Sequence, residues 1–304
     1  YVNDLPNCLD QAEASMFADD TNISTSAGSV EKLETQLNIE LDKIYRWLVA
    51  NRLTLNVSKT EYMIIGSRHK LGKIDKDPVI KIGSETVNRV HTSKSLGVII
   101  DDKLKWEDQI DSISKKVSRG IGAIKLIKPY VPMKCLSQVY NALVQPYFDY
   151  CSLVWQNCKL ELQSKLQKLQ NRAARIITGD NWEIRSKDVL NKLNWLPLNQ
   201  RRLTDTLLFM RKIFKDEVPI SISDQFQLSV NEQYNLRSNC TMLKLAKPRT
   251  NTLKRSFSYH AAKTWNKLPT DLKNLSLSDK VFKHNLKDFI NENPSFLSNF
   301  SSYL

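Results

Sequence analysis

The chain has 304 residues, of which 41% are hydrophobic and 9% aromatic, so it can bury a sizeable core and is not intrinsically disordered. Its 8 glycines favour a largely helical body over an array of tight hairpins. The net charge of +13 is uneven, since residues 1–100 hold 12 basic and 13 acidic side chains whereas residues 151–304 hold 25 and 13. No apolar run approaches the roughly 20 residues of a membrane span, so we expect no membrane partner.

The cysteines and histidines show no metal-binding spacing. The five cysteines include no Cys-x-x-Cys pair, and the four histidines lie far apart in the sequence. We therefore expect free thiols in a reducing compartment rather than a zinc site. No signal peptide is recognisable, and this predicts an intracellular protein.

The first feature with chemical meaning is the adjacent pair Asp19 and Asp20. Residues 14–18 are predicted to form a buried strand and residues 21–25 its antiparallel return, with the two carboxylates at the turn. Paired carboxylates are hard oxygen ligands that suit Mg²⁺ or Mn²⁺, and a rigid hairpin tip positions them better than a loop would. Many Asp-Asp pairs are solvated turn residues instead, so the pair by itself leaves both interpretations open.

A long helix is predicted next, with Ser29 as its N-cap and with its end at Asn51 and Arg52. Its leucine and isoleucine residues recur at helical intervals, which indicates one apolar face packed beneath the strands that carry the aspartates. These residues are Leu33, Leu37, Leu41, Ile44 and Leu48.

Short strands are predicted to follow. Residues 60–65 form one strand with Lys59 at its entry, and residues 67–78 form a polar loop. Two strands at 79–82 and 86–90 are joined by residues 83–85. A further strand at 96–100 carries Gly97, and glycine within a strand often marks a bulge or a close backbone approach.

Helices are predicted from Leu104 onward. An apolar stripe from Ile110 to Ile124 indicates the first, Pro129 and Pro132 mark a break, and further helices are expected at 133–145 and 160–177. Four basic residues lie on the outer faces of the last of these. They could follow a nucleic-acid backbone or form a solvated face, and the sequence leaves both open. They are Lys165, Lys168, Arg172 and Arg175.

The remaining chain is predicted to contain helices at 186–194, 199–214 and 278–291, a loop at 221–235, and a frayed tail. Two strands are predicted at 242–246 and 252–256, and five basic residues are interleaved with them, with Phe257 and Tyr259 close behind. This combination suits single-stranded nucleic acid, although the aromatic residues could also be core. The basic residues are Lys244, Lys247, Arg249, Lys254 and Arg255.

Three sequence blocks, in this order and at these intervals, resemble the second half of a reverse transcriptase from non-LTR retrotransposons of the jockey-like kind. "FADDT" at 17–21 resembles the catalytic turn (motif C), "LTLNVSKTEYM" at 53–63 the lysine-bearing motif D, and "KSLGVIID" at 94–101 the primer-grip hairpin (motif E). The resemblance continues along most of the chain, at residues 1–6, 143–150, 155, 169–176, 234–237 and 265–269.

The resemblance implies an α+β fold. Residues 1–101 would form part of a polymerase palm, a small antiparallel sheet with a packed helix. Residues 102–180 would form a thumb-like helical region and residues 181–304 a basic C-terminal region. Asp19 and Asp20 would hold two Mg²⁺ or Mn²⁺ ions, and Lys59 would assist departure of pyrophosphate. The primer grip would consist of Leu96, Gly97 and Val98.

The function implied is RNA-directed DNA polymerase, a nucleotidyltransferase whose partners are an RNA template, a DNA primer and deoxynucleoside triphosphates, acting in the nucleus on target DNA. The earlier catalytic aspartate (motif A) and the glycine-rich motif B cannot be placed in this sequence. We therefore expect an N-terminally truncated fragment that is inactive as an isolated polymerase. Two alternatives are a non-catalytic nucleic-acid-binding remnant and a functionless genomic relic.

Overall fold

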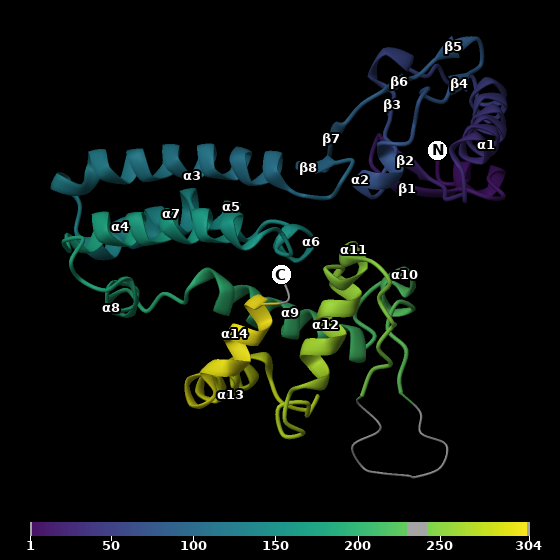
Figure 1. Ribbon diagram of the computed structural model, residues 1–304. Helices are drawn as coiled ribbons and strands as arrows, with labels where there is room; N and C mark the ends of the chain where they lie inside the picture. The colour runs from purple at the N-terminus through teal and green to yellow at the C-terminus, as the bar shows by residue number, and fades with distance from the viewer. Residues whose placement is uncertain (1, 230–241, 303–304) are drawn as a thin grey trace. The chain divides into compact units, whose positions relative to one another are not determined.

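The structure is a computed structural model that describes residues 2–229 and 242–302. The chain divides into two compact units, residues 1–104 and 105–304. Helices dominate, and the strands of the described residues pair in four two-stranded sheets, so the α+β class is confirmed (Figure 1). The division into three functional parts at 101 and 180 stays a prediction.

The first unit opens with a short 3₁₀ helix, η1 (Leu5–Cys8), and a hairpin of β1 (Glu13–Phe17) and β2 (Asp20–Ser24). The strands are antiparallel, with Phe17 paired to Asp20, so Ala18 and Asp19 form the turn. Ala18 has a φ of 54°, the left-handed conformation that a tight turn needs. The predicted hairpin is confirmed, with Asp20 already in the second strand.

The long helix α1 (Val30–Ala50) begins and ends where the sequence predicts. The Oγ atom of Ser29 accepts a hydrogen bond from the amide of Lys32 at 3.3 Å. The buried side chains of Leu41, Ile44 and Leu48 share a core with partly buried residues of the aspartate hairpin. This packing confirms that α1 supports the strands carrying Asp19 and Asp20.

The predicted strand at 60–65 is wrong in extent. After the 3₁₀ turn η2 (Val57–Lys59), only β3 (Glu61–Tyr62) is extended, and it pairs in parallel with β6 (Asn88–Arg89). The predicted loop at 67–78 contains a short helix, α2 (Arg68–Leu71), because Ser67 caps it through the amide of Lys70.

The next two predicted strands form a hairpin, but both are shorter than expected. β4 (Lys81–Ile82) pairs with β5 (Glu85–Thr86) across Gly83, whose φ of 60° meets the turn's need for a left-handed residue. β4 also packs beside α1 (Figure 1).

The last hairpin of this unit corrects the predicted position of Gly97. The strands are β7 (Thr92–Ser95) and β8 (Val98–Asp101), and Leu96 and Gly97 form the turn between them. Their φ angles are 46° and 84°, so both are left-handed. Two consecutive left-handed residues form the two-residue turn whose backbone twist matches that of the two strands it joins. Gly97 therefore closes a turn rather than marking a bulge within a strand.

The second unit begins with α3 (Glu107–Ile127), whose predicted apolar stripe is fully buried. After the proline-marked break, η3 (Lys128–Tyr130), the chain returns through α4 (Met133–Leu143), α5 (Gln145–Asp149) and α6 (Ser152–Trp155). The helix α7 (Leu160–Thr178) then runs alongside α3 (Figure 1). The predicted helices in this region are confirmed.

The predicted pair of helices around Pro197 is also confirmed, as α8 (Ser186–Lys192) and α9 (Leu198–Phe214). The second is central to a large core, in which its buried Leu203, Leu207 and Met210 pack with Trp265 and Phe282. A short helix, α10 (Ile220–Ser223), lies in the region predicted to be a loop.

The two strands predicted near residue 250 are wrong. The first is reduced to a single bridge between Leu228 and Leu243. The second is helical, because Thr250 caps α11 (Asn251–Lys254) through the amide of Leu253. The helix α12 (Phe257–Asn266) follows and was not predicted. The motif residues 234–237 and Cys240 lie outside the described residues.

The final helix prediction is confirmed as α13 (Asp279–Glu292), with Ser278 as its cap. The frayed tail is not, because α14 (Pro294–Ser302) follows. Phe296 and Phe300 are spaced by four residues and are only 9% and 3% exposed, so they anchor this helix in the core. Within the described residues, no helix combines the length and apolar character that crossing a membrane requires.

Candidate metal turn and nucleic-acid surface

The two aspartates lie at the tip of the β1–β2 hairpin. Asp19 is in the turn, and Asp20 is the first residue of β2, opposite Phe17. Both side chains are exposed, and neither forms an ion pair with a described residue. The turn therefore presents two unneutralised carboxylates to solvent.

The two carboxylates are oxygen donors of the kind that Mg²⁺ or Mn²⁺ prefers, but they are fewer than the ligands such an ion needs. Among the described residues, no cluster of three or more histidine, cysteine, aspartate or glutamate side chains could hold a metal ion. Divalent ions in polymerases are shared between protein carboxylates and substrate phosphates. Asp19 and Asp20 alone are too few ligands for a divalent ion, so a metal bound at this turn would need further ligands.

Lys59 is the last residue of η2 and is exposed immediately before β3. Its turn is held by the amide of Lys59 and the hydroxyl of Thr60, which both donate to the carbonyl of Asn56 at 3.1 Å. Among the described residues Lys59 makes no ion pair with either aspartate. The fold fixes its backbone, but within the described part of the chain no hydrogen bond or ion pair joins its side chain to Asp19 or Asp20.

The aspartate hairpin and the β7–β8 hairpin are in contact. The Nδ2 atom of Asn22 lies 3.5 Å from the Oγ atom of Ser95, although 73 residues separate them. Asn22 is two positions beyond Asp20, on the same face of β2. Ser95 directly precedes the turn formed by Leu96 and Gly97. The structure thus brings the ends of the two motif-bearing hairpins together.

The three residues expected to grip the primer have different environments. Leu96 is 43% exposed at the turn, and Gly97 is exposed beside it. Val98 is buried in the unit. The first two could touch a ligand directly, whereas Val98 anchors the hairpin.

The four basic residues of α7 differ in their contacts. Lys165 pairs with Asp111 at 2.6 Å. The guanidinium of Arg175 donates to the carbonyl of Ile184 and the hydroxyl of Ser186, which ties α7 to α8. Lys168 and Arg172 are exposed and have no ion pair with a described residue. Half of the stripe is therefore engaged in structural contacts.

The five basic residues between 244 and 255 are all exposed, and none forms an ion pair with a described residue. The aromatic residues behind them differ. Phe257 packs edge-on against Phe209, with ring centres 5.5 Å apart, and belongs to the core. Tyr259 is half-buried and lies under the ammonium of Lys263 at 5.8 Å. Phe257 is thus a packing residue, and the cations of this segment remain open to solvent.

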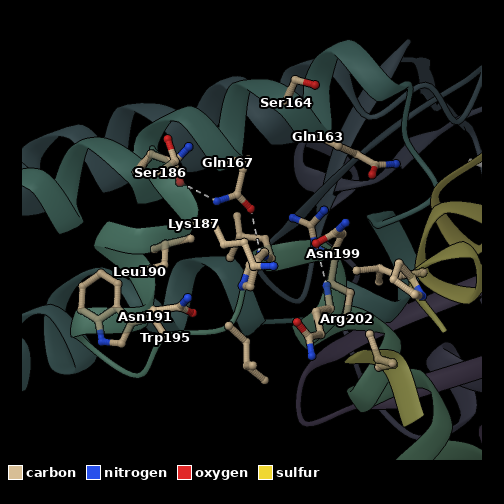
Figure 2. Close-up of a pocket in the computed structure, with 18 of the residues that line it drawn as sticks. Gln163, Ser164, Gln167, Ser186, Lys187, Leu190, Asn191, Trp195, Asn199 and Arg202 are labelled. Atoms are coloured by element: carbon tan, nitrogen blue, oxygen red, sulfur yellow. Dashed lines mark hydrogen bonds between the residues drawn. The ribbon is translucent and has the colours of Figure 1, made fainter. Parts of the chain in front are cut away.

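A cavity of about 610 Å³ in the second unit was not anticipated from the sequence. It is lined by residues of α7, α8, α9, α13 and α14, and Figure 2 shows Gln167, Trp195 and Arg202 around it. Arg202 is 3% exposed, and its guanidinium lies over the ring of Trp155 at 4.9 Å. Burial lowers the pKa of Arg202 to about 10. In the sequence this residue is only one of several basic residues on a predicted helix.

Two curated proteins are similar to part of the chain. They are RNA-directed DNA polymerases from the mobile element jockey of Drosophila melanogaster and of Drosophila funebris, 23% and 22% identical over 176 residues. The matched region covers 57% of this chain and 19% of each relative, so the chain spans about a fifth of the length of these relatives. No protein-family model matches, and no solved structure matches significantly. The similarity indicates distant homology to this class of reverse transcriptase.

Proposed function

We propose that this chain is part of the RNA-directed DNA polymerase of a non-LTR retrotransposon. Residues 1–101 would belong to the palm, residues 102–180 to the thumb and residues 181–304 to a basic C-terminal region. Distant homology to the jockey polymerases supports the class. The observation that carries the assignment is the contact between the hairpin with Asp19 and Asp20 and the hairpin with Leu96 and Gly97.

The proposed substrates are an RNA template, a DNA primer and deoxynucleoside triphosphates, with Mg²⁺ or Mn²⁺ as cofactor and the nucleus as the place of action. Asp19 and Asp20 would hold the divalent ions on one side. When bound, such ions supply positive charge that stabilises an in-line displacement at phosphate. Asp19 and Asp20 would hold such an ion from a turn whose two strands pack into the core beside α1.

The proposed roles of the other residues follow from their exposure. Lys59 would offer a proton or a positive charge to the departing pyrophosphate. Leu96 and Gly97 would contact the primer end, with Val98 as their buried anchor. Because two carboxylates supply only part of the metal ligands, we propose that this chain alone binds a primed template without extending it.

The test is binding of a primed RNA template to the full chain, with Mg²⁺ and with EDTA. Mg²⁺ should raise the affinity several-fold, and Asp19→Asn with Asp20→Asn should remove that gain. A control with the same charge change, Asp75→Asn with Asp224→Asn, alters two exposed aspartates without ion pairs to described residues. An equal Mg²⁺ dependence in all three proteins would overturn the proposal.

A second candidate is a nucleic-acid-binding module without polymerase chemistry. The observation that favours it is the segment from Lys244 to Arg255, whose five exposed cations form no ion pair with a described residue. Under this function, binding of nucleic acid would be independent of Mg²⁺ and of both aspartates. The same experiment therefore separates the two candidates.

A further inference from the structure

We propose that one end of the second unit is a stacking surface for single-stranded nucleic acid, with Tyr130 and Trp182 as its aromatic platforms. Stacking follows from these two side chains. The choice of nucleic acid over another anionic partner rests in addition on the proposed function. The sequence blocks that resemble reverse transcriptase motifs include neither residue, and both are outside the basic segment from Lys244 to Arg255.

The three most exposed of the large apolar side chains that the structure describes are at this end. Leu126, Tyr130 and Trp182 are 76%, 85% and 82% exposed. Large apolar side chains that are scattered singly over a surface are ordinary, whereas a group of them marks a contact site. Their shared location therefore has to be established next.

Chain contacts bring the three side chains to the end of the unit at which α3 leads into α4 (Figure 1). Leu126 is in the last turn of α3, and Tyr130 is the last residue of η3. Trp182 is three residues beyond Gly179, the C-cap of α7. A β-carbon placed on Gly179 would lie 3.4 Å from the Nζ atom of Lys128, so the side chain of Lys128 in η3 lies against the end of α7. Because three residues of chain span at most about 10 Å, a strand of several nucleotides can reach both aromatic rings.

The loop that carries Trp182 is held on both sides of this residue. Before it, the Nζ atom of Lys192 binds Asp180 at 2.6 Å. After it, the guanidinium of Arg175 donates to the carbonyl of Ile184 at 2.8 Å. An aromatic side chain on a fixed backbone loses little conformational entropy when it binds. The backbone at Trp182 is thus preorganised, with the ring exposed for stacking.

Charge complementarity favours nucleic acid as the partner. Residues 112–148, which include Tyr130, contain no aspartate or glutamate. Lys125 and Lys134, on either side of Tyr130 in the sequence, are exposed and form no ion pair with a described residue. On the Trp182 loop, Glu183 is exposed and opposes this charge. Exposed aromatic rings beside unpaired cations supply base stacking and phosphate contact together, which is how single strands are bound without sequence preference.

The test is the anisotropy of a fluorescein-labelled thymidine dodecamer, titrated with the full chain without Mg²⁺. Trp182→Leu keeps an apolar side chain but removes the ring, so it should weaken binding by about tenfold, equivalent to about 1.4 kcal/mol. Trp182→Phe keeps a ring and should restore most of the affinity. The control is Ile220→Ala, which alters a 75% exposed residue of α10 and should bind like the unaltered chain.

A second probe separates stacking from charge. A dodecamer of abasic nucleotides carries the same phosphates without bases, so Trp182→Leu and the unaltered chain should bind it equally. Lys125→Glu with Lys134→Glu should weaken the binding of both probes. Its matched control is Lys212→Glu with Lys280→Glu, two exposed lysines elsewhere in the second unit, which should bind like the unaltered chain.

The proposal is overturned if Trp182→Leu and Tyr130→Leu both bind the thymidine strand as tightly as the unaltered chain. Vesicles of phosphatidylserine and phosphatidylcholine test another anionic partner. Vesicle binding that Trp182→Leu abolishes, with binding of the strand unaffected, would identify a membrane contact and also overturn it. Asp19→Asn with Asp20→Asn should leave binding of the strand unchanged. Loss of Mg²⁺-dependent binding of a primed template therefore counts against the proposed function alone.

Discussion

Two arginines of α9 show how the surroundings of a buried cation decide its role. Arg211 is as deeply buried as Arg202, but its guanidinium donates to the carbonyls of Asn274 and Leu277 and lies over Phe282. Its Nε atom is 3.5 Å from Asp279. Arg211 therefore joins α9 to the start of α13, whereas the buried guanidinium of Arg202 packs over Trp155 and leaves two donors without a partner among the described residues.

Replacing Arg211 by methionine should destabilise the second unit. The substitution keeps much of the packing but removes the hydrogen bonds to the carbonyls of Asn274 and Leu277, which costs about 3 kcal/mol. Urea unfolding followed by circular dichroism measures this loss. The matched control is Lys212→Met at the exposed neighbouring position, which should change stability by no more than about 0.5 kcal/mol. Equal effects of the two substitutions would refute the structural role of Arg211.

His260 should make the stability of the fold sensitive to acid. Burial lowers its pKa to about 4, below the roughly 6.5 of an exposed histidine. Between these pH values the unfolded chain binds a proton that the folded chain does not, so stability is lost as the pH falls from about 6.5 to 4. The full loss from this residue is about 3 kcal/mol.

The measurement for His260 is the free energy of unfolding at pH 7 and at pH 4. His260→Gln can retain a hydrogen bond to the carbonyl of Phe300, which the ring nitrogen contacts at 3.2 Å, but it cannot titrate. Its stability should fall less over this range than that of the unaltered chain. Parallel losses in both proteins would show that other groups cause the acid sensitivity.

At the scale of elements, the turn of the β7–β8 hairpin depends on glycine. Gly97 has a φ of 84°, and an alanine in that conformation costs about 1–2 kcal/mol. Gly97→Ala should therefore destabilise the first unit by this amount. Gly28→Ala is the control. No atom lies within 4 Å of the methyl group that it adds, and the backbone of Gly28 is not left-handed. Amide exchange of residues 92–101 reports the effect, and unchanged exchange would contradict it.

The helices could be predicted from the sequence because their apolar stripes are long. The stripes of α1, α3 and α7 repeat over about four turns each, and Ser29 and Ser278 signal where helices begin. α14 was missed because its serine and asparagine residues are typical of a loop. The burial of Phe296 and Phe300, which stabilises this helix, depends on tertiary packing. The strands predicted near residue 250 failed because Thr250 is a helix cap, a signal that outweighs local alternation.

At the scale of the whole molecule, the candidate site was only partly visible in the sequence. Asp19, Asp20 and Lys59 could be identified as motif residues at a predicted turn and strand entry. The contact between Asn22 and Ser95 could not, since it joins residues 73 positions apart. The cavity around Arg202 was also hidden, because its walls lie between Leu160 and Leu297 and meet only after the helices pack.

The uneven charge of the chain predicts salt-sensitive binding of single-stranded nucleic acid. If Lys247 and Arg249 each neutralise a phosphate, their reversal to glutamate should reduce the slope of log affinity against log salt by about 1.4. The control is Lys70→Glu with Lys73→Glu, two exposed lysines of the first unit. Fluorescence anisotropy at several salt concentrations measures the slopes. A slope that stays the same in the first variant would identify the segment as a solvated face.

Metal binding at the aspartate turn is tested most directly by the response of the ¹⁵N-labelled chain to Mn²⁺, which broadens NMR signals of nearby amides. We expect broadening centred on residues 18–22, extending to Ser95 and Leu96 because the two hairpins are in contact. Asp19→Asn with Asp20→Asn should abolish it. Broadening that is spread over all exposed carboxylates, or that persists in this variant, would contradict the claim that this turn is a metal-binding remnant of a polymerase.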